Sequence, residues 1–380
     1  MTSRERLLAL LKGEPTDRIG VHVMGVRVFT DWWLKGRGSH PSYRPVIEAV
    51  RERTDCLDGI GFDQGFYYSA ADIAIHRSVE QVPGHDEIEH HVTVVEGPRG
   101  PLRHVDAVHK VERLPMPIEH LVKTPEDAEN FLALPYAMPR PDIAPLVARD
   151  REVGDRGLVL VGIGSNPIGD VHSLLGSETL AYWSREHRDL VHRLLAEMLR
   201  RKMDVIKHFA TSGLNEAMPV VWGHVGAEAA VPPLHGPADF HDFVVRYDKP
   251  LHALMHETGG LVRVHCHGSL GKVLEGFVEA GADMVQPVEG PPEGDITLRE
   301  AKRLVGDRLT IEGNVQIARI YEDKPEGFRR LVEQTVADGK PGGRFVLCPT
   351  ASPYTLQLSE RAVSNYLTLI DVALEQGWYD

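Results

Sequence analysis

The sequence predicts a (β/α)8 barrel, or TIM barrel, that takes up residues 1–380 as a single domain. Three observations predict this class. From about residue 157 onward six apolar runs alternate with helical patterns, these runs are apolar on both faces, and two earlier runs near residues 19 and 57 bring the number of predicted strands to eight. Strands this apolar are typical of parallel pairing with helices covering both faces of the sheet. The predicted strands lie near residues 19, 57, 158, 219, 261, 283, 308 and 344.

Two segments are expected outside the repeating pattern. Residues 3–12 predict an N-terminal helical extension, because Thr2 and Glu5 have the spacing of a capping box. Residues 87–110 alternate polar and apolar side chains around the turn Gly97-Pro-Arg-Gly100. This alternation predicts an inserted β-hairpin that lies outside the barrel.

A doubly wound sheet is the alternative fold. Its best support is the glycine-rich turn Gly162-Ile-Gly164-Ser-Asn-Pro167 after a predicted strand. A dinucleotide-binding turn needs a third glycine where this chain has Pro167. The turn therefore does not favour a dinucleotide site, and the barrel remains the preferred fold.

Composition limits the partners. The net charge of −13 has no basic cluster set against it, so neither nucleic acid nor an anionic membrane is an expected partner. Three cysteines are too few for a disulfide framework and indicate a reducing compartment. No apolar run approaches the roughly 20 residues that span a bilayer, and the N-terminus resembles a helix start rather than a signal peptide. These features predict a cytoplasmic enzyme.

The stretch Leu261-Val-Arg-Val-His265-Cys-His267-Gly predicts a metal site. In a strand, His265 and His267 point to the same side and Cys266 to the other. Two imidazoles can hold a divalent ion, and the distant Cys348 would supply a soft third ligand, a set that suits zinc. The alternative is two ordinary histidines, one in the core and one on the surface.

Polar residues follow the ends of several predicted strands. In a barrel the carboxyl ends of the strands and the loops beyond them form the active site. We therefore expect these side chains to meet in the barrel mouth, with Glu228 as an exchangeable fourth zinc ligand and Glu289 in reserve. Taken singly, each has an ordinary structural explanation, such as a helix cap for Asn314. The set is Trp222, His224, Glu228, His265, His267, Gln286, Glu289, Glu312, Asn314, Gln316 and Cys348.

Several of these segments resemble the uroporphyrinogen decarboxylase superfamily over nearly the whole chain. The opening residues 2–13 with Asp17-Arg18 look like its first helix and strand. The blocks that look like its C-terminal half are His265-Cys-His-Gly268, Gly281-Ala-Asp283, Gly306-Asp-Arg308 and Gly313-Asn314. The resemblance implies a (β/α)8 barrel with the active site in its mouth.

The superfamily contains porphyrin decarboxylases and zinc-dependent methyltransferases that work with corrinoid proteins. The decarboxylases carry an Arg-Gln-Ala-Gly-Arg segment after the first strand, whereas the stretch that begins at His22 here has only Arg27. A polycarboxylate tetrapyrrole needs several cations, so this chain does not match that branch. The methyltransferases bind zinc through His-x-Cys and a cysteine roughly 75–85 residues later. His265 and Cys348 match that pattern, while His267 replaces the first cysteine.

The resemblance thus implies a zinc-dependent methyltransferase. Replacing a thiolate by an imidazole makes the zinc site less negative and a stronger Lewis acid. That change favours demethylation of a methoxylated small molecule, with a corrinoid on a separate partner protein as the methyl acceptor. We expect catalytic roles for Asn314, Gln316 and His224, which would orient the substrate or hydrogen-bond the leaving oxygen. The residues expected to contact the substrate are Trp222, Tyr67, Tyr68 and His22.

Other functions remain open from the sequence. The chain could be a decarboxylase or lyase of the same superfamily, with or without zinc, acting on a small carboxylated substrate. The identity of the methyl donor, the direction of transfer and a thiol in place of the corrinoid are equally open. The number of subunits is open too, with a homodimer among the alternatives.

Overall fold

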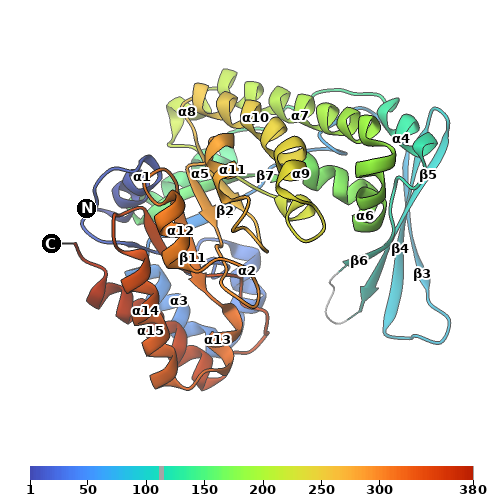
Figure 1. Ribbon diagram of the computed structural model, residues 1–380. Coiled ribbons are helices and arrows are strands. Elements are labelled where there is room, and N and C mark those ends of the chain that lie inside the picture. Colours follow the sequence, from blue (N-terminus) through green and yellow to red (C-terminus); the bar gives the residue numbers. More distant parts are fainter. Residues whose placement is uncertain (111–114, 380) are drawn as a thin grey trace.

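The computed structural model describes residues 1–110 and 115–379, and its centre is a barrel of eight parallel strands (Figure 1). The strands follow the order β1-β12-β11-β10-β9-β8-β7-β2. This order confirms the predicted (β/α)8 barrel and excludes a doubly wound sheet, because successive strands lie side by side around a ring. The barrel strands are β1 Gly20–Val21, β2 Cys56–Ile60, β7 Gly157–Ser165, β8 Val221–Val225, β9 Leu261–His265, β10 Met284–Gln286, β11 Thr310–Val315 and β12 Phe345–Pro349.

The ring is nearly closed between β1 and β2, where a side chain supports the seam. The backbone N–H of Asp55 donates to the carbonyl of Val21 at 2.7 Å. The Asp55 carboxylate in turn accepts from the N–H of Val21 at 2.9 Å and pairs with the guanidinium groups of Arg6 and Arg18 at 2.7 and 2.8 Å. Asp55 is fully buried, so this small charged cluster fixes the first helix and the first strand to the seam.

Helices surround the barrel, and they agree with the predicted periodic segments. Three of them begin with a capping box, at Thr2, Thr124 and Thr297, in which a threonine side chain and an acidic side chain three residues later satisfy each other's backbone N–H. The α-helices are α1 Ser3–Lys12, α2 Asp31–Lys35, α3 Arg44–Arg53, α4 Pro125–Leu132, α5 Ala144–Val153, α6 Pro167–Glu186, α7 Arg188–Thr211, α8 Leu214–Ala217, α9 Pro237–Phe240, α10 Arg246–Glu257, α11 Leu274–Ala280, α12 Leu298–Val305, α13 Ile317–Glu322, α14 Pro325–Gly339 and α15 Glu360–Gln376.

The N-terminal helix α1 closes the bottom of the barrel. Its apolar side chains pack against inward-facing residues of five strands, and the carbonyl of Leu10 accepts from the Thr310 hydroxyl at 2.5 Å. This contact layer defines which side chains face the lumen, since residues two apart on a strand share a face. Its buried members are Leu7, Leu10, Leu11, Leu57, Leu158, Val221, Met284 and Val346.

The predicted hairpin is present but belongs to a larger sheet. Strands β4 (Ile88–Gly97) and β5 (Gly100–His109) pair antiparallel as expected, and β3 (Ile75–Gln81) and β6 (Pro115–Glu119) extend them to four strands. The outer two strands were missed because their side chains are largely exposed and show no buried face.

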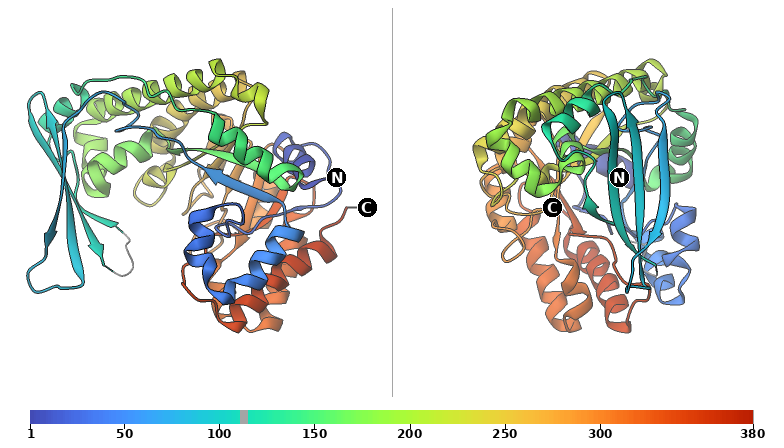
Figure 2. Two further views of the ribbon diagram at one scale, coloured as in Figure 1. Left: turned by 180° about the vertical axis from the view of Figure 1, so that it is seen from behind. Right: turned by 90° about the vertical axis from the view of Figure 1, so that its right-hand side faces the viewer.

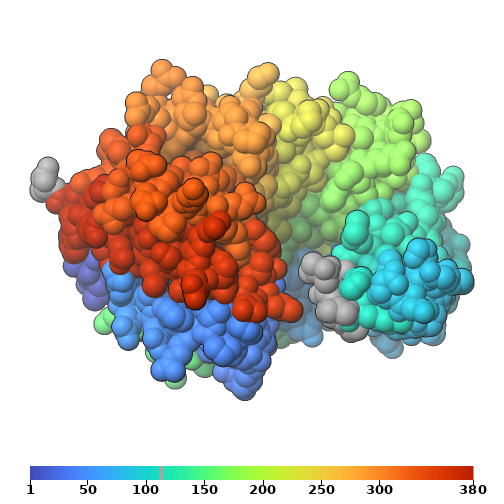
Figure 3. Space-filling model, turned by 90° about the horizontal axis from the view of Figure 1, so that it is seen from below, coloured from blue at the N-terminus to red at the C-terminus, as the bar shows by residue number. Residues whose placement is uncertain are grey.

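The four-stranded sheet stands at the far end of α6 and α7, away from α1 (Figures 1 and 2). Seen from below, it is separated by a hollow from the side of the molecule formed by α3, α14 and α15 (Figure 3). Since α1 marks the amino ends of the barrel strands, the sheet lies beyond their carboxyl ends. Among the described residues, no helix is both long and apolar enough to cross a membrane.

Candidate active site in the barrel mouth

A buried polar layer lies above the apolar floor of the lumen. Glu312 pairs in register with Val346, a floor residue, so its side chain points into the lumen. Its carboxylate accepts a hydrogen bond from Arg263 Nε of β9 at 2.5 Å. The same carboxylate lies 2.6 Å from Nδ1 of His22, which follows β1. Cys348, two residues after Val346, places its Sγ 3.7 Å from the same His22 nitrogen.

The charges in this layer set its protonation. Burial would raise the pKa of Glu312, but the Arg263 guanidinium and the hydrogen bond from His22 outweigh it and hold that pKa well below the usual value. An ionised carboxylate only accepts, so His22 Nδ1–H is the donor. Burial and the nearby Glu312 charge raise the pKa of the Cys348 thiol well above its ordinary range. The thiol is therefore protonated unless a cation displaces the proton.

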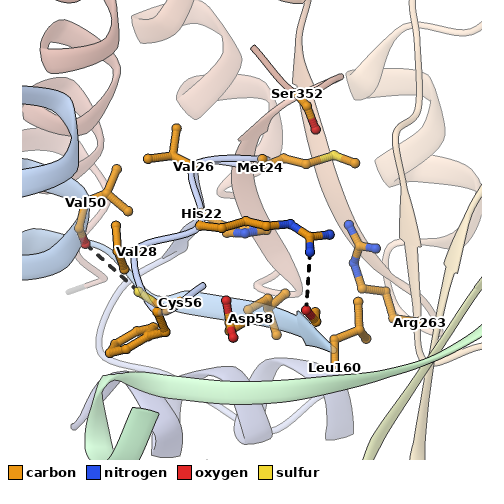
Figure 4. A pocket seen from close by; sticks show the side chains of 15 residues that line it. His22, Met24, Val26, Val28, Val50, Cys56, Asp58, Leu160, Arg263 and Ser352 are labelled. Atoms are coloured by element: carbon orange, nitrogen blue, oxygen red, sulfur yellow. Dashed lines mark hydrogen bonds between the residues drawn. The ribbon is translucent and has the colours of Figure 1, made fainter. Parts of the chain in front are cut away.

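A cavity of about 100 Å³ opens beside this layer. His22, Asp58 and Arg263 line it together with Leu160 and the backbone of β2 (Figure 4). Gly59 leaves part of this space free, because a Cβ added there would meet only the Arg27 guanidinium, at 3.7 Å. The lumen thus combines polar side chains from β9, β11 and β12 with a glycine-lined wall on β2.

His265 and His267 lie together at the end of β9, with ring centroids 4.7 Å apart and ring planes at 85°. The Gln286 amide donates to the carbonyls of Pro349 and Thr350 at 3.2 and 3.1 Å, which leaves its oxygen to accept from His265 Nδ1. Burial and the Arg263 charge lower the pKa of His265 to about 4, so the ring is neutral and its Nε2 carries a lone pair.

His267 is held in the same way by a carboxylate. Its Nδ1 lies 2.9 Å from Glu289, whose other oxygen accepts from the Gln316 amide at 2.8 Å. The hydrogen bond to Glu289 raises the pKa of His267. Histidines that bind metals usually donate one ring N–H to such an acceptor, which fixes the ring and directs the other nitrogen to the ion. Both rings at the end of β9 have this arrangement.

The two predicted acidic ligands have different surroundings. Glu228 accepts from the backbone N–H groups of Gly226 and His267 at 2.8 and 3.2 Å. Glu289 is nearly buried and is engaged by His267 and Gln316. Glu289 therefore lies in the position of a group that orients a ligand, while Glu228 braces the loop next to it.

The structure does not gather all the predicted zinc ligands. Within residues 1–110 and 115–379, two groups of three metal-ligating residues have their donor atoms within 4.8 Å of one another: His22, Glu312 and Cys348, and His224, Asp248 and His252. Cys348 thus lies with His22 and Glu312 rather than with the two imidazoles of β9. The zinc prediction for His265, His267 and Cys348 stays a prediction.

Two residues expected in the mouth lie outside the lumen. Val221 belongs to the floor, so Trp222 and His224 on the same strand point outward to the helices. Trp222 is fully buried against Phe209 of α7, with ring centroids 5.7 Å apart. His224 Nε2 lies 2.7 Å from His252 Nε2 of α10. The apolar pattern could not distinguish the two faces of β8, since both are buried.

The remaining predicted residues lie around the site. Tyr68 is buried and donates to the carbonyl of Ile163, while the Tyr67 ring packs against Phe131 with centroids 5.3 Å apart. Asn314 and Gln316 line a second hollow of about 400 Å³ next to α12–α14. Neither tyrosine lines the cavity beside His22.

Arg263, which lines the cavity and pairs with Glu312, is a residue of the candidate site that the sequence did not predict. Its signal was visible as a single charge inside the otherwise apolar run of β9. A charged residue that is buried on a strand needs a partner of opposite charge, and Glu312 supplies it.

Comparisons with known proteins agree with this architecture. Residues 115–352, more than half of the chain, match the family Uroporphyrinogen decarboxylase (URO-D). The structure is similar to that of a methyltransferase from Methanosarcina mazei, with a TM-score of 0.65 and 18% identity over 99% of both chains. At that identity the likeness concerns the fold.

A weaker similarity links the barrel to D-psicose 3-epimerase from Clostridium cellulolyticum H10. The TM-score is 0.37 and the identity 10%, over 62% of this chain and 83% of that one, which supports no conclusion about function. No curated protein sequence matches the chain. On the family match, together with the barrel and its polar mouth, the chain belongs to the uroporphyrinogen decarboxylase (URO-D) family.

Proposed function

We propose that the protein is a zinc-dependent methyltransferase that moves a methyl group between a small methoxylated substrate and a corrinoid carried by a separate protein. One observation carries the proposal. In both His265 and His267 an acceptor engages Nδ1, so that Nε2 of each ring is left for a metal at the mouth of a URO-D family barrel. Cys348 is the third proposed ligand.

The chain's residues fit such an ion in part. His265 is neutral, and its orientation is fixed by Gln286. The Cys348 thiol lies deeper in the lumen, so the site has to contract when all three ligands bind one ion. Zinc held there would supply Lewis acidity to the ether oxygen of the substrate. The cavity beside His22 and Gly59 would receive the rest of a small substrate.

The reaction would balance as a transfer to cobalt. A bound corrinoid would supply, from cobalt(I), the electron pair that accepts the methyl group as the carbon–oxygen bond of the methoxy group breaks. The leaving oxygen would take a proton from water. Asn314 and Gln316 are the proposed groups that orient the substrate. Gln316 donates to Glu289, the residue that orients His267, and Asn314 lies on β11 in the same hollow as Gln316.

The test combines metal analysis with a methyl-transfer assay. Purified protein should contain zinc, and it should convert free cob(I)alamin to methylcobalamin with a panel of methoxylated aromatic compounds. His265→Ala should lose both the mouth zinc and the transfer. The exposed His241→Ala serves as the matched control and should keep both. Protein without zinc, or a fully active His265→Ala variant, would contradict the proposal.

A second function has its own supporting observation. Arg27 lines the cavity, and no carboxylate among the described residues forms an ion pair with its guanidinium. A guanidinium that faces a cavity without a carboxylate partner suits a carboxylated substrate, which fits a decarboxylase or lyase of the same family. Release of CO₂ from small aromatic acids, abolished in Arg27→Gln, would favour this function over methyl transfer.

A further inference from the structure

A second cluster of metal-ligating residues lies outside the lumen, between the barrel wall and the helices. It consists of His224 on β8 with Asp248 and His252 on α10. One nitrogen of each ring and a carboxylate oxygen lie within 4.8 Å of one another. The three residues are 2%, 1% and 0% exposed, so bulk solvent does not reach them.

The hydrogen bonds of the cluster are incomplete. His252 Nδ1 lies 2.9 Å from the carbonyl of Ala280 and must donate to it, because a carbonyl only accepts. The lone pair of His252 is therefore on Nε2, which faces His224 Nε2 at 2.7 Å. One oxygen of Asp248 accepts from the Asn166 amide at 2.8 Å.

Two polar atoms are then left over in the interior. In the part of the chain that the structure describes, Nδ1 of His224 and Oδ1 of Asp248 are buried without a well-formed hydrogen bond, although the Val225 backbone lies near the His224 ring and the Lys202 ammonium near both side chains. A buried polar atom without a partner destabilises the folded state, because its hydrogen bonds to water are lost and not replaced. Two such atoms in one cluster of nitrogen and oxygen donors indicate that a cation belongs there.

The geometry points to a metal ion rather than to a missing water alone. The bond from His252 to a backbone carbonyl is the arrangement that fixes a metal-binding imidazole. Ligands bound at about 2.0–2.2 Å from zinc lie roughly 3–3.5 Å from one another, and the three donor atoms here lie within 4.8 Å of one another. Burial raises the pKa of Asp248 to about 7, so this carboxyl group would release its proton on binding the ion and would then supply the negative charge.

We propose that His224, Asp248 and His252 bind a divalent metal ion of the zinc class at a buried structural site that fastens α10 to β8. Burial lowers the pKa of His252 to about 3 and that of His224 well below its usual value, so both rings are uncharged. The proton on His224 Nε2, which points at His252, would move to Nδ1 when the ion binds. Cys266 is fully buried and close enough to Asp248 to be affected by its charge, which makes it the candidate for a fourth position.

The buried site does not depend on the proposed function. Its test must distinguish zinc bound at this site from zinc bound in the barrel mouth. The background is therefore a double variant, His265→Ala with Cys348→Ser, which removes two mouth ligands. We expect about one zinc per chain in this background by elemental analysis. Adding Asp248→Asn or His252→Gln should lower the zinc content at least fivefold.

A buried histidine outside the cluster provides the matched control. His235 is 3% exposed and also has a ring nitrogen without a partner, so His235→Gln reports the general effect of altering a buried histidine. In the double-variant background, His235→Gln should keep its zinc. A chelator should lower the melting temperature of the background and of His235→Gln, and should leave that of Asp248→Asn unchanged.

Two results would overturn the site. One is a double-variant background that contains no metal and whose melting temperature responds neither to zinc nor to a chelator. The other is an Asp248→Asn variant that retains its zinc. If Asp248→Asn fails to fold, His252→Gln decides on the same measurements, and the chelator response of the background decides without any change in the cluster.

Discussion

Arg263 of β9 and Glu312 of β11 form an ion pair inside the barrel, with Nε and Oε2 2.5 Å apart and both side chains almost completely buried. The pair crosses over β10 and lies directly above the apolar floor that α1 closes. The lumen therefore has two layers, one apolar and one charged. The floor holds the barrel together by apolar packing, and the charged layer positions His22 and the cavity beside it.

Removing the Glu312 charge should destabilise the barrel. Glu312→Gln leaves the Arg263 guanidinium buried without a counter-charge, a change that typically costs about 3–5 kcal/mol. Because the pKa of Glu312 is lowered in the folded state, its contribution is present above the unfolded pKa and is lost as pH falls through the folded pKa. Urea unfolding should therefore show that the difference in unfolding free energy between Glu312→Gln and the wild type is constant near neutral pH. The difference should become smaller below about pH 4.5.

The control for this prediction is an exposed glutamate. Glu48→Gln affects a surface pair with Arg44 and should not change stability measurably. If the difference in unfolding free energy between Glu312→Gln and the wild type grew as the pH falls, the pKa of Glu312 would not be lowered by folding.

The seam between β1 and β2 depends on Asp55. Asp55→Asn removes the charge shared by Arg6 and Arg18 and weakens the support of the Val21 N–H, so we expect a loss of about 3–5 kcal/mol. Hydrogen exchange should show the loss as faster opening of α1. Asp72→Asn, on an exposed loop residue, is the matched control and should exchange like the wild type.

The sequence predicted the strand count because most barrel strands, such as β7 and β12, are apolar runs that alternate with helical patterns. It could not predict which side chains enter the lumen, because parallel strands are buried on both faces. Trp222 and His224 illustrate the difficulty. Neighbouring residues on a strand point to opposite faces, so a shift of one position decides whether a side chain enters the barrel mouth or packs against the helices. The pairing of Cys348 with His22 was equally out of reach, since 326 positions separate them.

The two glutamates near His267 should differ in their effect on zinc. Glu289→Gln weakens the acceptor that orients His267, and loss of such an outer partner typically lowers metal affinity 10–100-fold. Glu228→Gln should have a smaller effect if Glu228 only braces the backbone of Gly226 and His267. Competition with a chromophoric chelator measures both affinities. A larger loss in Glu228→Gln would identify Glu228 as a direct ligand.

Filling the cavity at Gly59 should block the substrate without unfolding the protein. A Cβ at this position meets only the Arg27 guanidinium, at 3.7 Å, so Gly59→Ala should fold and react like the wild type. A leucine there would occupy much of the cavity of about 100 Å³ and should raise KM roughly tenfold or more. Steady-state methyl-transfer kinetics on both variants, with melting temperatures to confirm folding, provide the measurement. If Gly59→Leu is stable and leaves KM unchanged, the substrate does not bind in the cavity beside His22, and the second hollow lined by Asn314 and Gln316 becomes the place to look.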